Sequence, residues 1–218
     1  MADVTTVRGE VGVSVPGALT GEQALRLSRG GGLVTNERGK YYEMAKSGQL
    51  FHACTPDEGV APGTDQASTT APACLYNPAA SGKDLVILNG RMAYVSGTLG
   101  AGEVYWMANT NVAAAATTGT DMTVVRGYMS ASGANAAGQA ARALSSATLP
   151  AAASRARVFG SLDARLATTA GVGEAVLEDN VDGAMIVPPG GTVSIMADAA
   201  AGTSPLVAIS ITWLETPV

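Results

Sequence analysis

The chain has 218 residues and is poor in charge, with 14% charged and 5% aromatic residues, 27 glycines and a formal net charge of −5. This length predicts one large domain, or a domain with an arm, that buries enough surface to fold without a disulfide staple. The lack of a basic tract argues against a nucleic-acid partner, and the lack of a run of about 20 apolar residues argues against a membrane span. The first residues show no signal-peptide pattern, so we expect synthesis in a cytosol.

The low charge and the many small residues have two interpretations. They suit a surface that is covered by copies of the chain or by a partner, and they equally suit an ordinary sandwich with long Gly/Ala loops. Ten of the thirteen basic residues are arginine. Arginine is favoured over lysine at protein interfaces, which hints at assembly.

Residues 1–55 differ from the rest, because six of the thirteen basic residues lie before residue 47. Pro16-Gly17 and the triple glycine at 30–32 interrupt this segment. Residues 33–43 are predicted to form a small hairpin and residues 49–54 a short strand. We expect a charged, extended N-terminal arm, with edge strands of the main domain as the alternative. Because interfaces favour aromatic and arginine anchors, the expected partner-binding residues are Arg26, Arg29, Arg38, Lys40, Tyr41, Tyr42 and Phe51.

Residues 55–77 are predicted to be a surface loop, because this stretch and its flank hold Pro56, Pro62, Pro72 and Pro78 and little to bury. The main body then begins with an apolar run at residues 85–88. Asn89-Gly90 falls where the apolar phase changes, as a β-bulge requires. The glycine-rich residues 97–102 and the apolar residues 104–107 complete a predicted β-hairpin.

Further strands are predicted after this hairpin, and the last of them has the clearest pattern. Val207, Ile209, Ile211 and Trp213 alternate with small or hydroxyl residues, the period-two signature of a strand with one face in a core. Residues 188–191, Pro-Pro-Gly-Gly, predict a turn. An all-β sandwich of about eight strands over residues 56–218 is therefore expected, with strands also at 122–129, 155–162, 176–181, 184–187 and 192–197.

His52 and Cys54 are candidates for chemistry, because residues two apart on a strand share a face and could act as base and nucleophile. No third orienting group or oxyanion loop accompanies them, so a structural histidine is the expectation. With Cys74 they give only three soft ligands, where a structural zinc site uses four. A cytosolic origin predicts free thiols, and a Cys54–Cys74 disulfide stays open for a protein that oxidises after release.

Two further groups have a functional and a structural interpretation. Trp106 and Trp213 could line a sugar site, but they lie on the most regular strands, so core packing is expected. Four acidic residues could bind calcium, but their spacing fits no calcium loop and a solvated strand edge is expected: Glu174, Glu178, Asp179 and Asp182. The sequence thus predicts no catalytic residue, no metal and no cofactor.

Several turn and strand segments resemble structural proteins encoded in the morphogenesis regions of tailed bacteriophages. The similarity spans most of residues 39–218 and is carried by residues 39–51, 77–88, 94–102, 187–195 and 211–215. Proteins of this kind are typically jelly-roll sandwiches that form trimers on virions. The resemblance implies a capsid cement (decoration) protein, or a spike or fibre head, and it transfers no catalytic residues.

From this resemblance we expect a non-enzymatic virion structural protein, a homotrimer that decorates and stabilises a bacteriophage capsid. It would be made in the bacterial host cytoplasm and lie on the capsid surface, with itself and the major capsid protein as partners. The alternative is the receptor-binding head of a tail fibre or head spike, whose loops contact a host surface receptor. An enzyme such as a depolymerase would need paired carboxylates in a groove, and the sequence offers no such pair.

Overall fold

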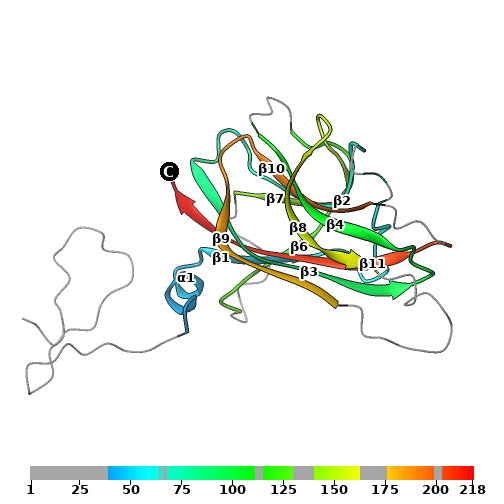
Figure 1. The fold of residues 1–218 in the computed structure, drawn as a ribbon. Helices are drawn as coiled ribbons and strands as arrows, with labels where there is room; N and C mark the ends of the chain where they lie inside the picture. Colours follow the sequence, from blue (N-terminus) through cyan, green and yellow to red (C-terminus); the bar gives the residue numbers. More distant parts are fainter. Residues whose placement is uncertain are drawn as a thin grey trace, which may run out of the picture. The chain divides into compact units, whose positions relative to one another are not determined.

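The computed structural model describes residues 39–63, 65, 68–110, 115–129, 140–162, 176–198 and 203–218. Within these ranges lie one short helix and eleven strands (Figure 1): α1 (Tyr42–Lys46), β1 (Leu50–Cys54), β2 (Thr70–Tyr76), β3 (Lys83–Ser96), β4 (Gly102–Asn109), β5 (Thr120–Asp121), β6 (Thr123–Arg126), β7 (Arg142–Thr148), β8 (Ser154–Leu162), β9 (Val176–Val187), β10 (Thr192–Asp198) and β11 (Leu206–Pro217). The helix found in this part of the chain is too short to cross a membrane.

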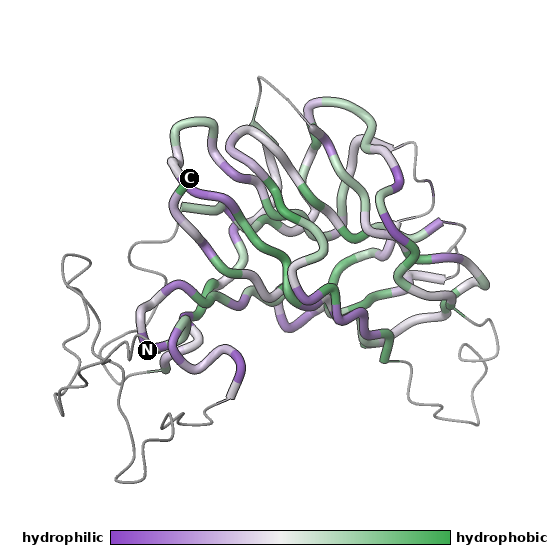
Figure 2. The backbone as a smooth tube through the Cα atoms, turned by 60° about the vertical axis from the view of Figure 1, so that its left-hand side comes forward, coloured by the Kyte–Doolittle hydropathy of each residue, from purple (hydrophilic) through white to green (hydrophobic). Residues whose placement is uncertain are grey.

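The strands form two antiparallel sheets that pack face to face, which confirms the predicted β-sandwich. The five-stranded sheet has the order β6-β1-β11-β3-β9, and the six-stranded sheet has the order β5-β7-β2-β10-β4-β8. Without β5–β7, the remaining eight strands pair as two four-stranded sheets in the order of a jelly roll. Strands β5–β7 are an insertion between β4 and β8 that widens both sheets at one edge. Hydrophobic stretches run along the strands of both layers (Figure 2).

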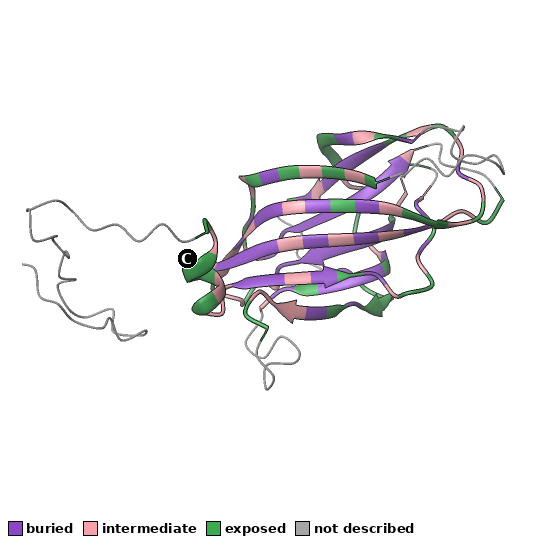
Figure 3. Cartoon of the chain, turned by 90° about the horizontal axis from the view of Figure 1, so that it is seen from below, coloured by how far each residue is buried: buried purple, intermediate pink, exposed green. Residues whose placement is uncertain are grey.

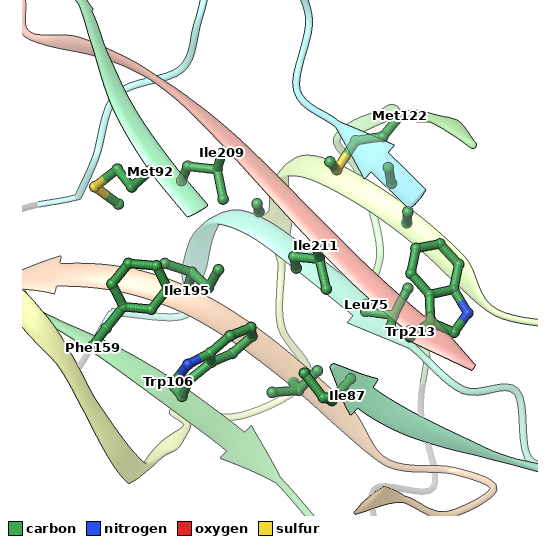
Figure 4. Close-up of a cluster of buried hydrophobic side chains, with 14 of the residues drawn as sticks. Leu75, Ile87, Met92, Trp106, Met122, Phe159, Ile195, Ile209, Ile211 and Trp213 are labelled. Atoms are coloured by element: carbon green, nitrogen blue, oxygen red, sulfur yellow. The ribbon is translucent and has the colours of Figure 1, made fainter. Parts of the chain in front are cut away.

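The core lies between the sheets, and the alternation of β11 is confirmed there. Val207, Ile209, Ile211 and Trp213 are at most 2% exposed, and several of these side chains meet residues of the opposite sheet (Figure 4). Phe51 of β1 stacks on Trp213 with ring centroids 5.8 Å apart. Trp106 of β4 is also fully buried in this cluster, so both predicted core tryptophans are core residues.

The bulge predicted at Asn89-Gly90 lies one residue earlier, at Leu88, and Gly90 makes room for Trp106. Pairing of β3 shifts register between Ile87 and Asn89 against β9. Trp106 reaches across from β4, so a Cβ at Gly90 would lie only 2.3 Å from its Cζ2 atom. Only glycine allows such a close approach of an indole ring to the backbone.

The predicted hairpin between residues 85–88 and 104–107 is wrong, because these strands belong to different sheets. Strand β3 pairs with β11 and β9, whereas β4 pairs with β10 and β8. The glycine-rich connection crosses between the layers. Gly97 has φ +80°, and a Cβ there would lie 2.1 Å from the carbonyl oxygen of Ser204. The connection thus needs glycine for a close crossing and not for a hairpin turn.

The predicted surface loop at residues 55–77 is wrong over its last third, where β2 lies between β7 and β10. Residues 71–76 are all buried. Proline at position 72 had argued against a central strand. Pro72 is tolerated because the pairing of β2 with β7 skips it, passing from Ala71 to Ala73, so no ladder hydrogen bond is lost.

The boundary predicted for the N-terminal arm is also wrong. The chain divides into two compact units, Met1–Glu43 and Met44–Val218, and β1 belongs to the second, where it lies inside the sheet between β6 and β11. The hairpin predicted for residues 33–43 falls mostly outside the described residues. Its last part enters α1, where Glu43 in the first turn and Lys46 in the last complement the helix dipole.

The two outer faces of the sandwich differ. On the six-stranded sheet the outward side chains are largely buried, among them Cys74, Met107 and Met196 at no more than 1% exposure. Ala115, Ala116 and Leu149, which flank the strands, pack in the same cluster. The outer face of the five-stranded sheet carries partly exposed side chains between the buried ones (Figure 3). It is therefore the sheet surface that is open to a ligand.

We expect Trp213→Ala to lower the free energy of unfolding by about 3–5 kcal/mol, the range for loss of a large core aromatic. Trp213 is fully buried and stacked on Phe51. Chemical denaturation of both proteins measures the difference. Val218→Ala is the control, because Val218 is 81% exposed and should change stability by no more than about 0.5 kcal/mol. An unchanged midpoint for Trp213→Ala would contradict the packing described above.

Candidate functional site

A groove of about 900 Å³ lies on the outer face of the five-stranded sheet. The strand registers place two rows of outward side chains across all five strands. Both rows cross the strands in the order β6, β1, β11, β3 and β9. The first row consists of Val125, His52, Thr212, Asn89 and Asn180. The second row, beside it, consists of Thr123, Cys54, Ser210, Arg91 and Glu178. All ten residues line the groove.

The groove is hollow because its central strands carry short side chains. On β11 the outward positions next to the core residues Ile209 and Ile211 are Ser210 and Thr212, and on β1 the outward position beside Ser210 is Cys54. Such side chains leave the sheet surface low along its middle. Five strands at about 4.8 Å spacing make the groove about 19 Å long across the sheet.

One wall is a polar network on β3 and β9. Asn89 donates from Nδ2 to Glu178 Oε1 at 2.9 Å and to Asn180 Oδ1 at 2.7 Å. Arg91 Nη2 donates to the same Glu178 oxygen at 2.9 Å. Hydrogen bonding from Arg91 is the main cause that lowers the pKa of Glu178. The four side chains therefore hold one another in place, with the carboxylate ionised at neutral pH.

The opposite wall is formed by β6 and the segments next to it. It presents apolar surface from Val125 and from Met129, which is 77% exposed, whereas Met122 is only 5% exposed and packs in the core. Asp57 and Asp121 lie at the rim, and Asp121 accepts a hydrogen bond from Arg142 at 3.2 Å. The groove thus has a polar wall, an apolar wall and a floor of hydroxyl groups.

His52 and Cys54 both line the groove, but they do not form a base–nucleophile pair. His52 Nδ1 lies 3.0 Å from Thr212 Oγ1, and burial lowers the pKa of His52. Burial and the nearby Asp57 carboxylate raise the pKa of the Cys54 thiol. An activated cysteine needs a lowered pKa, so Cys54 stays a protonated thiol. The structural reading of His52 agrees with this geometry.

The other sequence candidates serve the fold. Cys54 and Cys74 are both free thiols, and burial raises the pKa of Cys74 to about 12. Glu174 lies outside the described residues. Asp179 accepts two hydrogen bonds from Arg157, at 2.7 and 2.9 Å, and one from Trp106. The described residues contain no group of His, Cys, Asp and Glu side chains that could hold a metal ion.

Glu215 is a buried carboxylate away from the groove and is also structural. Its side chain accepts hydrogen bonds from Lys83 Nζ at 2.9 Å and from the backbone N–H groups of Ala140 and Ala141. Trp213 Nε1 lies 3.4 Å from the same carboxylate. These donors satisfy a charge that would otherwise be costly to bury, and they fix the chain just before β7.

The predicted partner-binding residues do not form one surface that the structure describes. Arg26, Arg29 and Arg38 lie outside the described residues. Lys40 lies with its Nζ 5.3 Å from the centroid of the Tyr41 ring, and Tyr42 is 39% exposed. For Phe51 the prediction is wrong, because this residue is 1% exposed and stacks on Trp213 in the core. No partner can reach Phe51 without unfolding β1.

We expect His52 to make stability depend on pH. A histidine has a pKa of about 6.5 in an unfolded chain, and burial lowers the pKa of His52 in the folded protein. Its contribution is therefore present above about pH 6.5 and is lost as the pH falls through the lower, folded pKa. Denaturation measures the free energy of unfolding of the wild type and of His52→Gln. As the pH is lowered from about 8 to about 5.5, this free energy should fall further for the wild type than for the variant. His52 is the only histidine in the chain, so a constant difference would contradict this expectation.

Comparison with protein-family models, with curated protein sequences and with solved structures found no match to the chain. Its function is therefore inferred from its own residues and their geometry.

Proposed function

We propose that the chain is a non-enzymatic virion structural protein, a homotrimer that decorates and stabilises a bacteriophage capsid. The jelly-roll order of the eight main strands supports this function most directly. It is the architecture implied by the phage-protein resemblance of residues 39–218. Further copies of the chain and the major capsid protein are its partners, and it lies on the capsid surface after synthesis in the bacterial host cytoplasm.

Stabilisation of a shell needs no chemistry at a site. A ligand that binds only the assembled shell stabilises that shell by its binding free energy. A trimer placed across a junction of shell subunits must leave before the junction opens. The side chains in the groove fit this role, since Cys54 keeps its proton and Arg91 lowers the pKa of Glu178. A glycosidase acid needs a raised carboxyl pKa.

The edge of the sandwich formed by β8 and β9 supports self-association. Among the strands that the structure describes, each is the last of its sheet, so each presents an outer row of backbone groups with no neighbour among those strands. Val158 on β8 is 66% exposed and Ile186 on β9 is 57% exposed. Exposed apolar side chains on free strand edges are typical of surfaces that pair with another chain.

The second candidate is the receptor-binding head of a tail fibre or head spike. The groove favours it, because a decoration protein needs no concave polar site on an open sheet face. Copy number separates the two roles: a decoration protein covers the whole shell, whereas a fibre or spike head is present only at a few positions.

We expect the isolated protein to be a trimer, with three times the monomer mass of 21.8 kDa. Light scattering coupled to gel filtration at micromolar concentration measures this mass. Replacing Val158 and Ile186 together by glutamate should shift the mass toward the monomer, because charges would be buried at the interface. Val218→Glu is the control, since Val218 is 81% exposed at the C-terminal end. A wild-type monomer would contradict the proposal.

We expect the N-terminal unit to anchor the protein to the shell. A chain that begins at Met44 keeps the second compact unit whole, whereas a chain that begins at Pro72 would lose β1 and unfold. The shorter protein, Met44–Val218, should keep its circular dichroism spectrum and its trimeric mass but fail to bind particles stripped of the native protein. Full occupancy by this truncated protein would assign the anchor to the sandwich instead.

A further inference from the structure

We propose that the groove on the five-stranded sheet binds a neutral oligosaccharide. This inference rests on the second candidate function, recognition of a surface, and does not depend on capsid decoration. The proposed ligand class follows from three properties of the groove: its shape, the pairing of a polar with an apolar wall, and its charge.

The shape fits an elongated ligand. The two rows of outward side chains cross all five strands, which gives a trough about 19 Å long. The floor stays low because Cys54, Ser210 and Thr212 have short side chains. A single small molecule would leave most of this trough empty, whereas a chain of sugar rings can lie along it.

The walls match the two kinds of surface that a sugar ring presents. Hydroxyl groups at the edge of a ring both donate and accept hydrogen bonds, and the wall of Asn89, Arg91, Glu178 and Asn180 offers both donors and acceptors. The C–H faces of a ring are apolar, and Val125 with Met129 offers the opposite wall. Sites of this kind combine apolar contact with a few placed polar groups.

The polar wall is already ordered without a ligand. Glu178 accepts from both Arg91 and Asn89, and Asn89 also donates to Asn180. Groups held in one arrangement lose little conformational freedom on binding, so preorganisation favours affinity. Ligand hydroxyls can then bond to the remaining lone pairs and N–H groups of the same residues.

Charge selects a neutral ligand over an acidic one. Arg91 on β3 is paired with Glu178 on β9 and Asp121 is paired with Arg142 on β7, while Asp57 adds negative charge at the rim. Burial lowers the pKa of His52 on β1, so its ring is uncharged at neutral pH. The ionisable groups that line the groove therefore carry a net negative charge, which repels uronic or sialic acids.

The test uses the full-length protein and an array of neutral and acidic oligosaccharides of three to six sugars. The best neutral oligosaccharide is then titrated by calorimetry against the wild type and three variants. Ser210→Tyr fills the floor and should weaken binding by about tenfold or more, and Asn180→Ala removes one wall amide and should weaken it severalfold. Ser161→Tyr is the matched control, because Ser161 is an exposed serine on β8 outside the groove.

Retention of neutral oligosaccharides with these losses, and unchanged binding by Ser161→Tyr, would support the site. The proposal is overturned if the wild type retains no oligosaccharide or prefers acidic ones. It is also overturned if a folded Ser210→Tyr binds as the wild type does; where Ser210→Tyr fails to fold, unchanged binding by Asn180→Ala decides against it. Binding to shells is measured separately. A protein that binds shells but no oligosaccharide would overturn the sugar site alone, and a protein that binds oligosaccharide but no shells would overturn capsid decoration alone.

Discussion

The contact of Trp106 with the opposite sheet is the interaction on which the sandwich depends. The indole extends from β4 to the backbone of Gly90 on β3, packs on Phe159 at 5.7 Å between ring centroids, and donates from Nε1 to Asp179 at 2.9 Å. Arg157 on β8 holds the same carboxylate with two hydrogen bonds. One side chain thus joins both layers near the edge where β8 and β9 end their sheets.

Much of the fold was predictable from local patterns. Strand β11 alternates from Leu206 to Trp213 because one of its faces points into the core and the other points outward, and the Asn89-Gly90 dipeptide marks a phase change next to the bulge at Leu88. The hairpin prediction failed because glycine-rich connections look alike whether they turn within a sheet or cross between sheets. Strand β2 was missed because Pro72 is a strand breaker in any local reading, and only the pairing with β7 shows that its N–H group is not needed.

The site was harder to predict than the fold. Its two rows join β6, β1, β11, β3 and β9, which are not neighbours in sequence order, so no sequence window contains the groove. The one local signal was the pair Ser210 and Thr212 on the outward face of β11, where short hydroxyl side chains replace the long charged ones that usually face solvent. His52 and Cys54 were recognised as a pair on one face. In the structure both side chains line the groove, where burial lowers the pKa of His52 and raises that of Cys54.

The central claim is that this chain decorates a phage shell, and a reconstruction of the virion that contains it tests the claim most directly. The account predicts three-fold clusters of jelly-roll density at equivalent junctions over the whole outer surface, with the N-terminal unit against the major capsid protein. Jelly-roll density restricted to the ends of fibres or spikes, or purified virions that lack the chain, would contradict the claim.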